Sequence, residues 1–191
     1  MSKVTNILLV GVGGQGTILA SKVLGQVALS LGQEVKVAEI HGMSQRGGNV
    51  VTQVRYGEKV YSPIIQLGQA DIILAFEKVE ALRWLPYLKK GGKIIVNDQE
   101  IDPMPVIMGK VPYPENVLEQ LKSHGEVTLI PALDLAKEAG NAKTTNVVLL
   151  GVLAKTMDIP QETWQKVLQN LVPAKFLDVN LRAFQLGLEW R

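Results

Sequence analysis

The stretch LLVGVGGQGTILASKVLG, residues 8–25, decides the fold that we expect for this chain. Its aliphatic beginning predicts a buried strand, and a helical pattern follows over residues 15–31. A second strand is expected over residues 34–40, which completes a β-α-β unit with a right-handed crossover and therefore indicates a parallel sheet. Between the first strand and the helix stand three glycines at the G-x-G-x-x-G spacing, namely Gly11, Gly13 and Gly16.

The residues beyond this unit depart from a plain doubly wound pattern. Residues 49–56, NVVTQVRY, alternate and predict a strand, and residues 60–63, VYSP, predict its short partner strand across a turn. Later segments predict strands over residues 71–76, 93–96 and 126–130, and helices over residues 79–90, 116–123 and 133–139. The last third of the chain predicts helices only.

The order of these elements predicts an α/β fold. We expect a Rossmann-like, doubly wound, mostly parallel sheet with an inserted β-hairpin and a helical C-terminal third. No internal repeat and no long linker divides the chain, so we expect one domain over residues 1–191. Residues 145–157 are apolar nearly all round, and are therefore expected either in the core or at a contact between subunits.

The composition excludes several classes of chemistry. The chain has 191 residues, a net charge of +2, two histidines and no cysteine. Without cysteine there is no disulfide, no thiolate nucleophile and no cysteine-held iron–sulfur cluster, and a zinc site of the usual kinds is not expected. The small net charge gives no argument for nucleic acid, and no apolar run approaches the ~20 residues that span a bilayer. The N-terminal stretch has no signal-peptide pattern, so we expect a cytoplasmic protein.

The glycine turn is typical of a site for a nucleotide or another anion. Glycine allows positive φ and close approach of a ligand, and a helix that begins near Gly16 directs free N–H groups at the turn. Glu39 follows the turn by about 20 residues, where a carboxylate would bind the ribose hydroxyls of NAD. The alternative is that the glycines only allow the strand and the helix to pack closely, and the residues alone leave both interpretations open.

A second loop, GMSQRGGNVVTQVRYG over residues 42–57, holds an arginine beside two glycines. The guanidinium of Arg46 carries a permanent charge and a fork of donors that suits a carboxylate or a phosphate. Gly47 and Gly48 would let such an anion approach the backbone. The alternative is that Arg46 forms a salt bridge to a partner subunit and the glycines serve as turn residues; the two roles can coexist.

Four stretches follow one another along the chain: GVGGQG (11–16), GMSQRGGNVVTQVRYG (42–57), ADIILAFEKVEALRWLPYLKKGGKIIVN (70–97) and KTTNVVLLGVLA (143–154). Together they resemble the gamma domain of the 2-oxoacid:ferredoxin oxidoreductases, and the resemblance covers nearly the whole chain. Within that family the likeness is greatest to the small (beta) subunits of the indolepyruvate:ferredoxin oxidoreductases.

The resemblance implies a subunit that is not active alone. In that family a 2-oxoacid, here an aryl pyruvate such as indolepyruvate, is oxidatively decarboxylated to an acyl-coenzyme A, and the electrons pass to ferredoxin. The thiamine diphosphate and [4Fe–4S] clusters are implied on a large (alpha) subunit, whose active region this chain would complete and cover. The chain itself would carry no catalytic residue and no metal, and a homodimer is a further expectation when it is isolated.

The residues expected to contact coenzyme A, substrate or partner are Gly11, Gly13, Gly16, Arg46, Gly47, Gly48, Glu77 and Asn146. Arg46 is the favoured anion contact, either for a coenzyme A phosphate or for the substrate carboxylate. The alternative for Glu77 is an ordinary acid at a helix N-terminus, and the alternative for Asn146 is a residue that starts a helix. Whether coenzyme A touches this chain at all stays open.

Two other functions stay open from the sequence. One is a free-standing NAD(P)-binding protein or redox sensor, which rests on the glycine turn and Glu39. The other is an interaction module without any cofactor contact, which would bind its large partner through residues 145–157 and the C-terminal helix.

Overall fold

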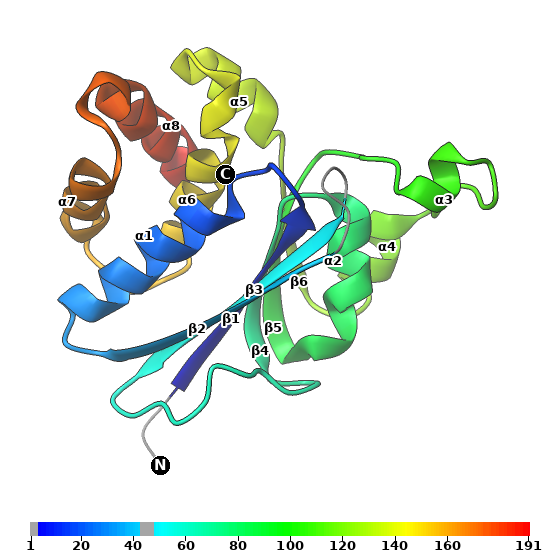
Figure 1. Ribbon diagram of the computed structural model, residues 1–191, viewed down its shortest axis with the longest axis horizontal. Helices are drawn as coiled ribbons and strands as arrows, with labels where there is room; N and C mark the ends of the chain where they lie inside the picture. The colour runs from blue at the N-terminus through cyan, green and yellow to red at the C-terminus, as the bar shows by residue number, and fades with distance from the viewer. Residues whose placement is uncertain (1–3, 43–47) are drawn as a thin grey trace.

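A six-stranded mixed sheet lies between two layers of helices in the computed structural model, which describes residues 4–42 and 48–191 (Figure 1). The strand order across the sheet is β2-β3-β1-β4-β5-β6. This arrangement confirms the α/β class expected from the sequence. The strands are β1 (Val4–Val12), β2 (Glu34–His41), β3 (Asn49–Gly57), β4 (Ala70–Ala75), β5 (Leu88–Asn97) and β6 (Glu126–Ile130).

The strand β3 interrupts an otherwise parallel sheet. β1, β4, β5 and β6 run parallel to one another. β3 is antiparallel both to β1 and to β2, so β1 and β2 point the same way, as the β-α-β unit predicts, but are not neighbours. The antiparallel hairpin of this fold therefore consists of β2 and β3.

The prediction that residues 60–63 form the second strand of a hairpin is wrong, because this segment has no strand structure. Side chains hold it against the sheet instead. The carboxylate of Glu34 accepts a hydrogen bond from the N–H of Val60 at 3.0 Å. The guanidinium of Arg55 donates to the carbonyl oxygens of Ser62 and Ile64 at 2.8 and 3.0 Å.

The helices are distributed unequally between the two faces of the sheet (Figure 1). One face carries five helices, α1 (Thr17–Ser30), α5 (Ala132–Ala139), α6 (Thr145–Lys155), α7 (Gln161–Leu171) and α8 (Leu177–Glu189). The other face carries α2 (Lys78–Trp84) and α4 (Val117–Lys122). A single helical turn, α3 (Met104–Ile107), stands apart from the body of the molecule.

Two hydrophobic cores fill the spaces between the sheet and these layers. Ile7 and Leu9 of β1 belong to the core under the five helices, whereas their neighbours Leu8 and Val10 belong to the core under α2 and α4. Successive side chains of a strand point to opposite faces, and both faces of the central strands are covered. The central strands therefore read as continuous apolar runs.

The helix α6 lies within the core, as its apolar surface indicates. Every residue from Asn146 to Ala154 is buried. Two glycines let α6 and α8 pack closely, since a Cβ on Gly151 would overlap the carbonyl oxygen of Phe184 and one on Gly187 would overlap that of Val148. Burial within this chain accounts for the apolar helix without a contact between subunits.

The helix expected over residues 79–90 is shorter than predicted. α2 ends at Trp84, a 3-10 turn spans Leu85–Tyr87, and β5 begins at Leu88. Pro86 lacks an N–H and cannot continue the helical hydrogen bonds. The leucines at every third position, Leu82, Leu85 and Leu88, therefore suggest a longer helix than the one that forms. Among the helices described for residues 4–42 and 48–191, none is both long and apolar enough to cross a membrane.

Candidate functional site

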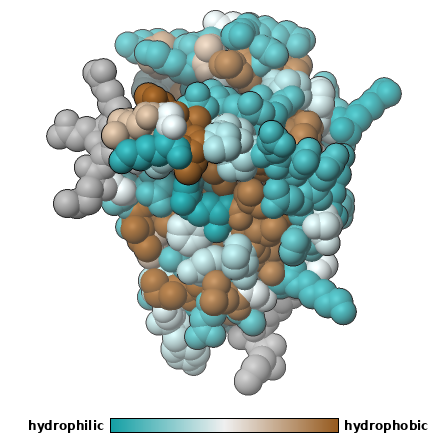
Figure 2. Space-filling view, turned by 90° about the vertical axis from the view of Figure 1, so that its right-hand side faces the viewer, coloured by the Kyte–Doolittle hydropathy of each residue, from teal (hydrophilic) through white to brown (hydrophobic). Residues whose placement is uncertain are grey.

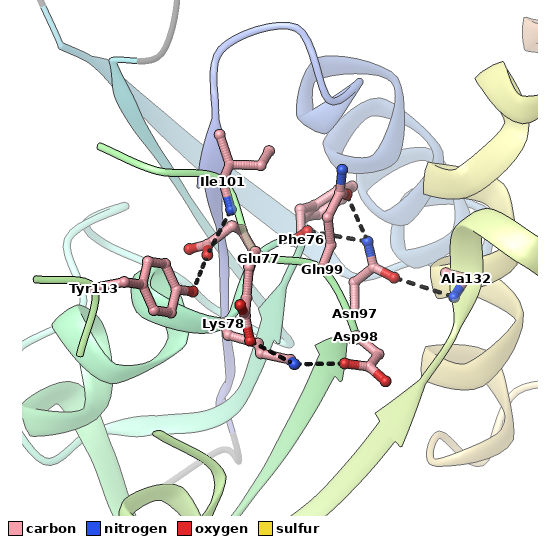
Figure 3. Close-up of polar contacts among 10 residues, drawn as sticks. Phe76, Glu77, Lys78, Asn97, Asp98, Gln99, Ile101, Tyr113 and Ala132 are labelled. Carbon is pink, nitrogen blue, oxygen red and sulfur yellow. Dashed lines mark hydrogen bonds and ion pairs between the residues drawn. The ribbon is translucent and has the colours of Figure 1, made fainter. Parts of the chain in front are cut away.

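The candidate site lies at the carboxyl end of the parallel strands, where open α/β sheets bind ligands. The glycine turn between β1 and α1 meets there the residues that follow β4 and β5, and the start of α6. Side-chain amides link these segments, and Figure 3 shows several of them around the carbonyl oxygen of Phe76.

Each glycine of the turn has its own structural reason. A Cβ on Gly11 would lie 2.6 Å from Oε1 of Gln15 and 2.9 Å from Cβ of Phe76, so no larger residue fits. Gly14 and Gly16 have φ of +95° and +81°, in the left-handed region that glycine tolerates. Gly13 donates its N–H to the carbonyl oxygen of Gly48 at 3.0 Å, which extends the β1–β3 ladder.

Gln15 closes the turn from inside. Its Oε1 accepts the N–H of Val12 at 2.7 Å, and its Nε2 donates to the carbonyl oxygen of Phe76 at 3.0 Å. The turn is therefore cross-linked to the end of β4 by one side chain. Sequence reasoning missed this residue, which occupies a variable position of the glycine motif.

Asn97 makes the same kind of link from β5. It is buried, and its Nδ2 donates to the carbonyl oxygen of Phe76 at 3.2 Å and to Oε1 of Gln99 at 3.0 Å. Its Oδ1 accepts the N–H of Ala132 at 3.1 Å, at the start of α5 (Figure 3). β4, β5 and α5 are thus held in register at the edge where a ligand would bind.

Glu77 has a structural role at this edge. It is the N-cap of α2 and only 1% exposed, and its carboxylate accepts the N–H of Glu80 at 2.9 Å. The N–H of Ile101 and the hydroxyl of Tyr113 donate to it at 3.3 and 2.6 Å. Figure 3 shows Glu77 directed at Tyr113 and Ile101, while Asn97 turns to Phe76. The structure therefore agrees with the alternative given for Glu77, an acid at a helix N-terminus. Its carboxylate already accepts hydrogen bonds from three donors.

The Tyr113 hydroxyl is held in its protonated form. Burial raises its pKa above the ordinary value, and the hydrogen bond that it donates to the Glu77 carboxylate raises the pKa further. Next to it, Lys78 forms ion pairs with Asp98 at 2.6 Å and with Glu100 at 3.1 Å. The surroundings of Glu77 are therefore a fixed polar network.

Asn146 connects the glycine turn to the C-terminal third. The residue is buried at the start of α6, and its Nδ2 donates to the carbonyl oxygen of Gly16 at 3.1 Å. The structure thus brings together five of the residues expected at the site, namely Gly11, Gly13, Gly16, Gly48 and Asn146. Arg46 and Gly47 lie outside the described residues, so their predicted roles stay predictions.

A cavity of about 360 Å³ opens beside the glycine turn. Its lining includes Gly14, Gly16 and Gln15 on one side and Lys143 and Thr145 on the other. The exposed Lys143 adds a positive charge to a cavity bounded by the N-terminal ends of α1 and α6, an arrangement that suits an anion. Sequence reasoning missed Lys143, although a cation two residues before the start of α6 was a usable signal.

The geometry does not match a dinucleotide site of the Rossmann type. β3 separates β2 from β1, which places Glu39 two strand spacings, about 10 Å, to the side of the β1 ladder. The Glu39 carboxylate accepts a hydrogen bond from Oγ of Ser21 at 3.0 Å and lies 3.7 Å from Nε2 of His41. Within the described part of the chain, no group of three His, Cys, Asp or Glu side chains could hold a metal ion.

Comparison with known proteins gives consistent matches. A family model described as pyruvate ferredoxin/flavodoxin oxidoreductase matches residues 6–190. The chain is 47% identical over 192 residues to indolepyruvate oxidoreductase subunit IorB of Thermococcus kodakarensis, covering 96% of this chain and 94% of that protein. It is 39% identical over 187 residues to the IorB subunit of Methanothermobacter thermautotrophicus, covering 95% of each.

Solved structures share the fold. The gamma subunit of a keto/oxoacid ferredoxin oxidoreductase from Geobacter sulfurreducens has a TM-score of 0.73 at 25% identity, covering 97% of this chain and 96% of that chain. The 2-oxoglutarate:ferredoxin oxidoreductase of Magnetococcus marinus, solved with 2-oxoglutarate, coenzyme A and succinyl-CoA bound, has a TM-score of 0.76 at 23% identity. That match covers 98% of this chain and 31% of the larger chain, and it supports the fold alone.

Proposed function

Since this chain belongs to the pyruvate ferredoxin/flavodoxin oxidoreductase family, we propose that it is the small subunit of an indolepyruvate:ferredoxin oxidoreductase. The observation that carries the proposal is the 47% identity to an indolepyruvate oxidoreductase subunit over nearly the full length of both chains. A shared fold alone would not support a substrate, because one fold hosts many functions.

The chain's own residues support a division of labour between two subunits. Thiamine diphosphate and [4Fe–4S] clusters would supply decarboxylation and electron transfer to ferredoxin, and we place both on the large subunit. This chain has no cysteine with which to hold a cluster. Its contribution is then to assist the reaction from the carboxyl edge of its sheet.

That edge offers contacts for an anion rather than groups for proton transfer. The cavity beside the glycine turn combines the Lys143 ammonium with Gly14 and Gly16, where the backbone is exposed to an approaching ligand. A coenzyme A phosphate or the substrate carboxylate has the charge that this cavity would accept. Arg46, which lies outside the described residues, stays our favoured second anion contact. Asn146 and Gln15 hold the turn in place and are positioning residues.

The proposal is tested by reconstitution. The chain is co-expressed with the cysteine-rich, thiamine-binding large subunit under anaerobic conditions, and ferredoxin reduction is followed with indolepyruvate and coenzyme A. We expect reduction by the pair and none by either subunit alone. Reduction by this chain alone, or a purified pair that does not turn over indolepyruvate, would contradict the proposal.

Titration with NADH separates this proposal from a free-standing nucleotide-binding protein. We expect no heat of binding from the purified chain at NADH concentrations up to about 1 mM, which corresponds to less than about 4 kcal/mol of binding free energy. The structural reason is the displaced position of Glu39, because β3 separates the strand that carries this carboxylate from β1. Micromolar binding would favour the alternative.

A further inference from the structure

Residues 101–116, in the connection between β5 and α4, carry several apolar side chains that are exposed to solvent. Met104, Ile107, Met108 and Val111 are 51%, 64%, 59% and 51% exposed. The helical turn α3 within the segment buries none of its residues. Figure 1 shows it standing away from the sheet, and Figure 2, viewed from that side, shows brown apolar side chains between polar ones. We call this segment the apolar arm.

The apolar arm has a defined structure although it has no core of its own. Backbone hydrogen bonds close its turn, among them Met108 N–H to the Met104 carbonyl at 2.9 Å and Lys110 N–H to the Pro105 carbonyl at 2.9 Å. Both ends are fixed to one buried carboxylate, since Ile101 and Tyr113 each donate a hydrogen bond to Glu77. The backbone that carries these apolar side chains is thus preorganised, which lowers the conformational entropy lost when a partner binds.

The arm is continuous with the candidate site. Gln99, two residues before the arm begins, accepts a hydrogen bond from Asn97 in the network around the Phe76 carbonyl. Glu77, which anchors the arm, directly follows Phe76 in the chain. One partner surface that reaches the glycine turn can therefore also reach the arm.

The size of the arm argues against a second copy of this chain as the partner. The four exposed side chains present on the order of 400 Å², about half of the ~800 Å² that each partner of a stable complex buries. Symmetric pairing through the arm alone would fall short of that area. A partner that covers the arm and the adjacent site can reach it.

We propose that the apolar arm is a docking surface for the large subunit, an inference that rests on the function proposed above. The arm carries Asp102 and Glu115, both exposed, near its two ends, and Lys110 is its one lysine. The matching surface on the large subunit is accordingly an apolar pocket with a basic rim. Assembly through the arm places the carboxyl edge of this chain against the subunit that holds the thiamine.

The test uses Ile107→Asp with Leu67→Asp as its matched control. Both residues are exposed apolar side chains, at 64% and 65%, but Leu67 precedes β4 and so lies at the opposite end of the sheet. Each variant, and Met108→Asp as a second change in the arm, is titrated against the purified large subunit by calorimetry. Because none of the three side chains is in the core, the melting temperature of the free chain should stay that of the wild type.

We expect both arm variants to weaken binding of the large subunit more than tenfold, and Leu67→Asp to change it less than twofold. Wild-type affinity in both arm variants would overturn the docking surface, while wild-type turnover of indolepyruvate by the same pair would leave the proposed function standing. Loss of self-association by the arm variants, with unchanged affinity for the large subunit, would also overturn it in favour of a second copy. If the wild-type chain does not bind the large subunit, the proposed function itself fails.

Discussion

The side-chain amide of Asn146 donates a hydrogen bond to the carbonyl oxygen of Gly16, which lies 130 residues earlier in the chain. This contact joins the turn after the first strand to the start of a helix in the last third of the sequence. A turn that resembles a local motif is therefore completed by a distant residue. Its geometry depends on the C-terminal helices being in place.

The first prediction concerns the glycine turn. Gly14→Ala should lower the free energy of unfolding by about 1–2 kcal/mol, because alanine is strained at positive φ. Gly16→Ala has the same strain, and its Cβ would also lie 2.6 Å from Nδ2 of Asn146. We expect roughly 1–2 kcal/mol more for it, as a hydrogen bond is displaced. Urea unfolding measures both losses.

A double substitution shows where the extra cost of Gly16→Ala arises. In an Asn146→Ala background, the displaced amide is absent, so Gly16→Ala should cost no more than Gly14→Ala. Equal costs of the two glycine variants in the wild-type background would contradict this account.

The second prediction concerns the link between Tyr113 and Glu77. Tyr113→Phe should lower the free energy of unfolding at pH 8 by about 1 kcal/mol, through loss of the hydrogen bond. The pKa of Tyr113 is raised in the folded state, so its contribution is fully present below about pH 10, the unfolded value, and is lost as the pH rises further.

The measurement compares urea unfolding of the wild type and Tyr113→Phe at pH 8 and at pH 10.5. The difference between them should shrink at the higher pH. Tyr61→Phe, at an 88% exposed position, serves as the control and should match the wild type at both values. A difference for Tyr113→Phe that is independent of pH would reject the assigned direction of the pKa shift.

The third prediction concerns the buried carboxylate of Glu80. One oxygen accepts from Nε of Arg83 at 3.1 Å, but the other, Oε2, has no hydrogen-bond partner among the described residues. Burial raises the pKa of Glu80, and the nearby Arg83 only partly offsets this. Because the pKa of Glu80 is raised in the folded state, the contribution of its protonated form to the free energy of unfolding is present at low pH. This contribution is lost as the pH rises above about 4.3, the pKa of glutamate in the unfolded chain.

Replacing this carboxylate by a neutral amide should therefore not weaken the fold at pH 7. We expect Glu80→Gln to raise the free energy of unfolding there by up to about 1 kcal/mol, and the gain to disappear at pH 4. Glu119→Gln, at an exposed position of α4, is the control. If Glu80→Gln lowers the free energy of unfolding at pH 7 and Glu119→Gln does not, the charged form of Glu80 stabilises the folded state, which would contradict this account.

The fourth prediction concerns Lys143. The side chain is exposed, so Lys143→Ala should leave the melting temperature unchanged. In the reconstituted pair we expect a three- to tenfold higher KM for coenzyme A, the loss of about 1 kcal/mol of charge-assisted binding, with kcat preserved. Lys166→Ala, a change at another exposed lysine, on α7, is the control. An unchanged KM would remove Lys143 from the anion site.

The fifth prediction concerns Arg46. Arg46→Ala should fold normally and reduce either assembly with the large subunit or turnover by at least about tenfold, the loss of roughly 1.4 kcal/mol. Arg46→Lys retains the charge without the planar fork, so partial rescue indicates a point charge and no rescue indicates a two-pronged contact. Unchanged assembly together with unchanged turnover in Arg46→Ala would reject both roles.

Local pattern predicted most elements of this fold but not their neighbours. The aliphatic run and helical spacing after it identify β1 and α1, because their periods are properties of adjacent residues. The alternation of residues 49–56 identifies β3 as a strand. It does not reveal that β3 pairs with β2 and β1 rather than with residues 60–63, since pairing is decided by contacts distant in the sequence.

The candidate site was predictable to a similar degree. Glycines predict a turn because few other residues adopt its positive φ angles or fit its close contacts, so Gly11 and Gly16 were identifiable. Gln15 and Asn97 were not, because no sequence pattern marks an amide that donates to the backbone carbonyl of one segment and accepts the N–H of another. The sequence places Glu77 at the carboxyl edge of the sheet, after β4. Only the hydrogen bonds from Ile101 and Tyr113, which are distant in the sequence, show that its carboxylate is already occupied.

The strand inserted beside β1 also limits what can be engineered into this fold. In dinucleotide-binding folds an acid after the second strand binds the ribose hydroxyl of NAD, whereas a nearby arginine accommodates the 2′-phosphate of NADP, so a swap of acid for base is expected to change the preferred coenzyme. In this chain Ser21 holds that acid, Glu39, beyond an intervening antiparallel strand. Such a swap would alter one surface charge and create no selectivity for either coenzyme.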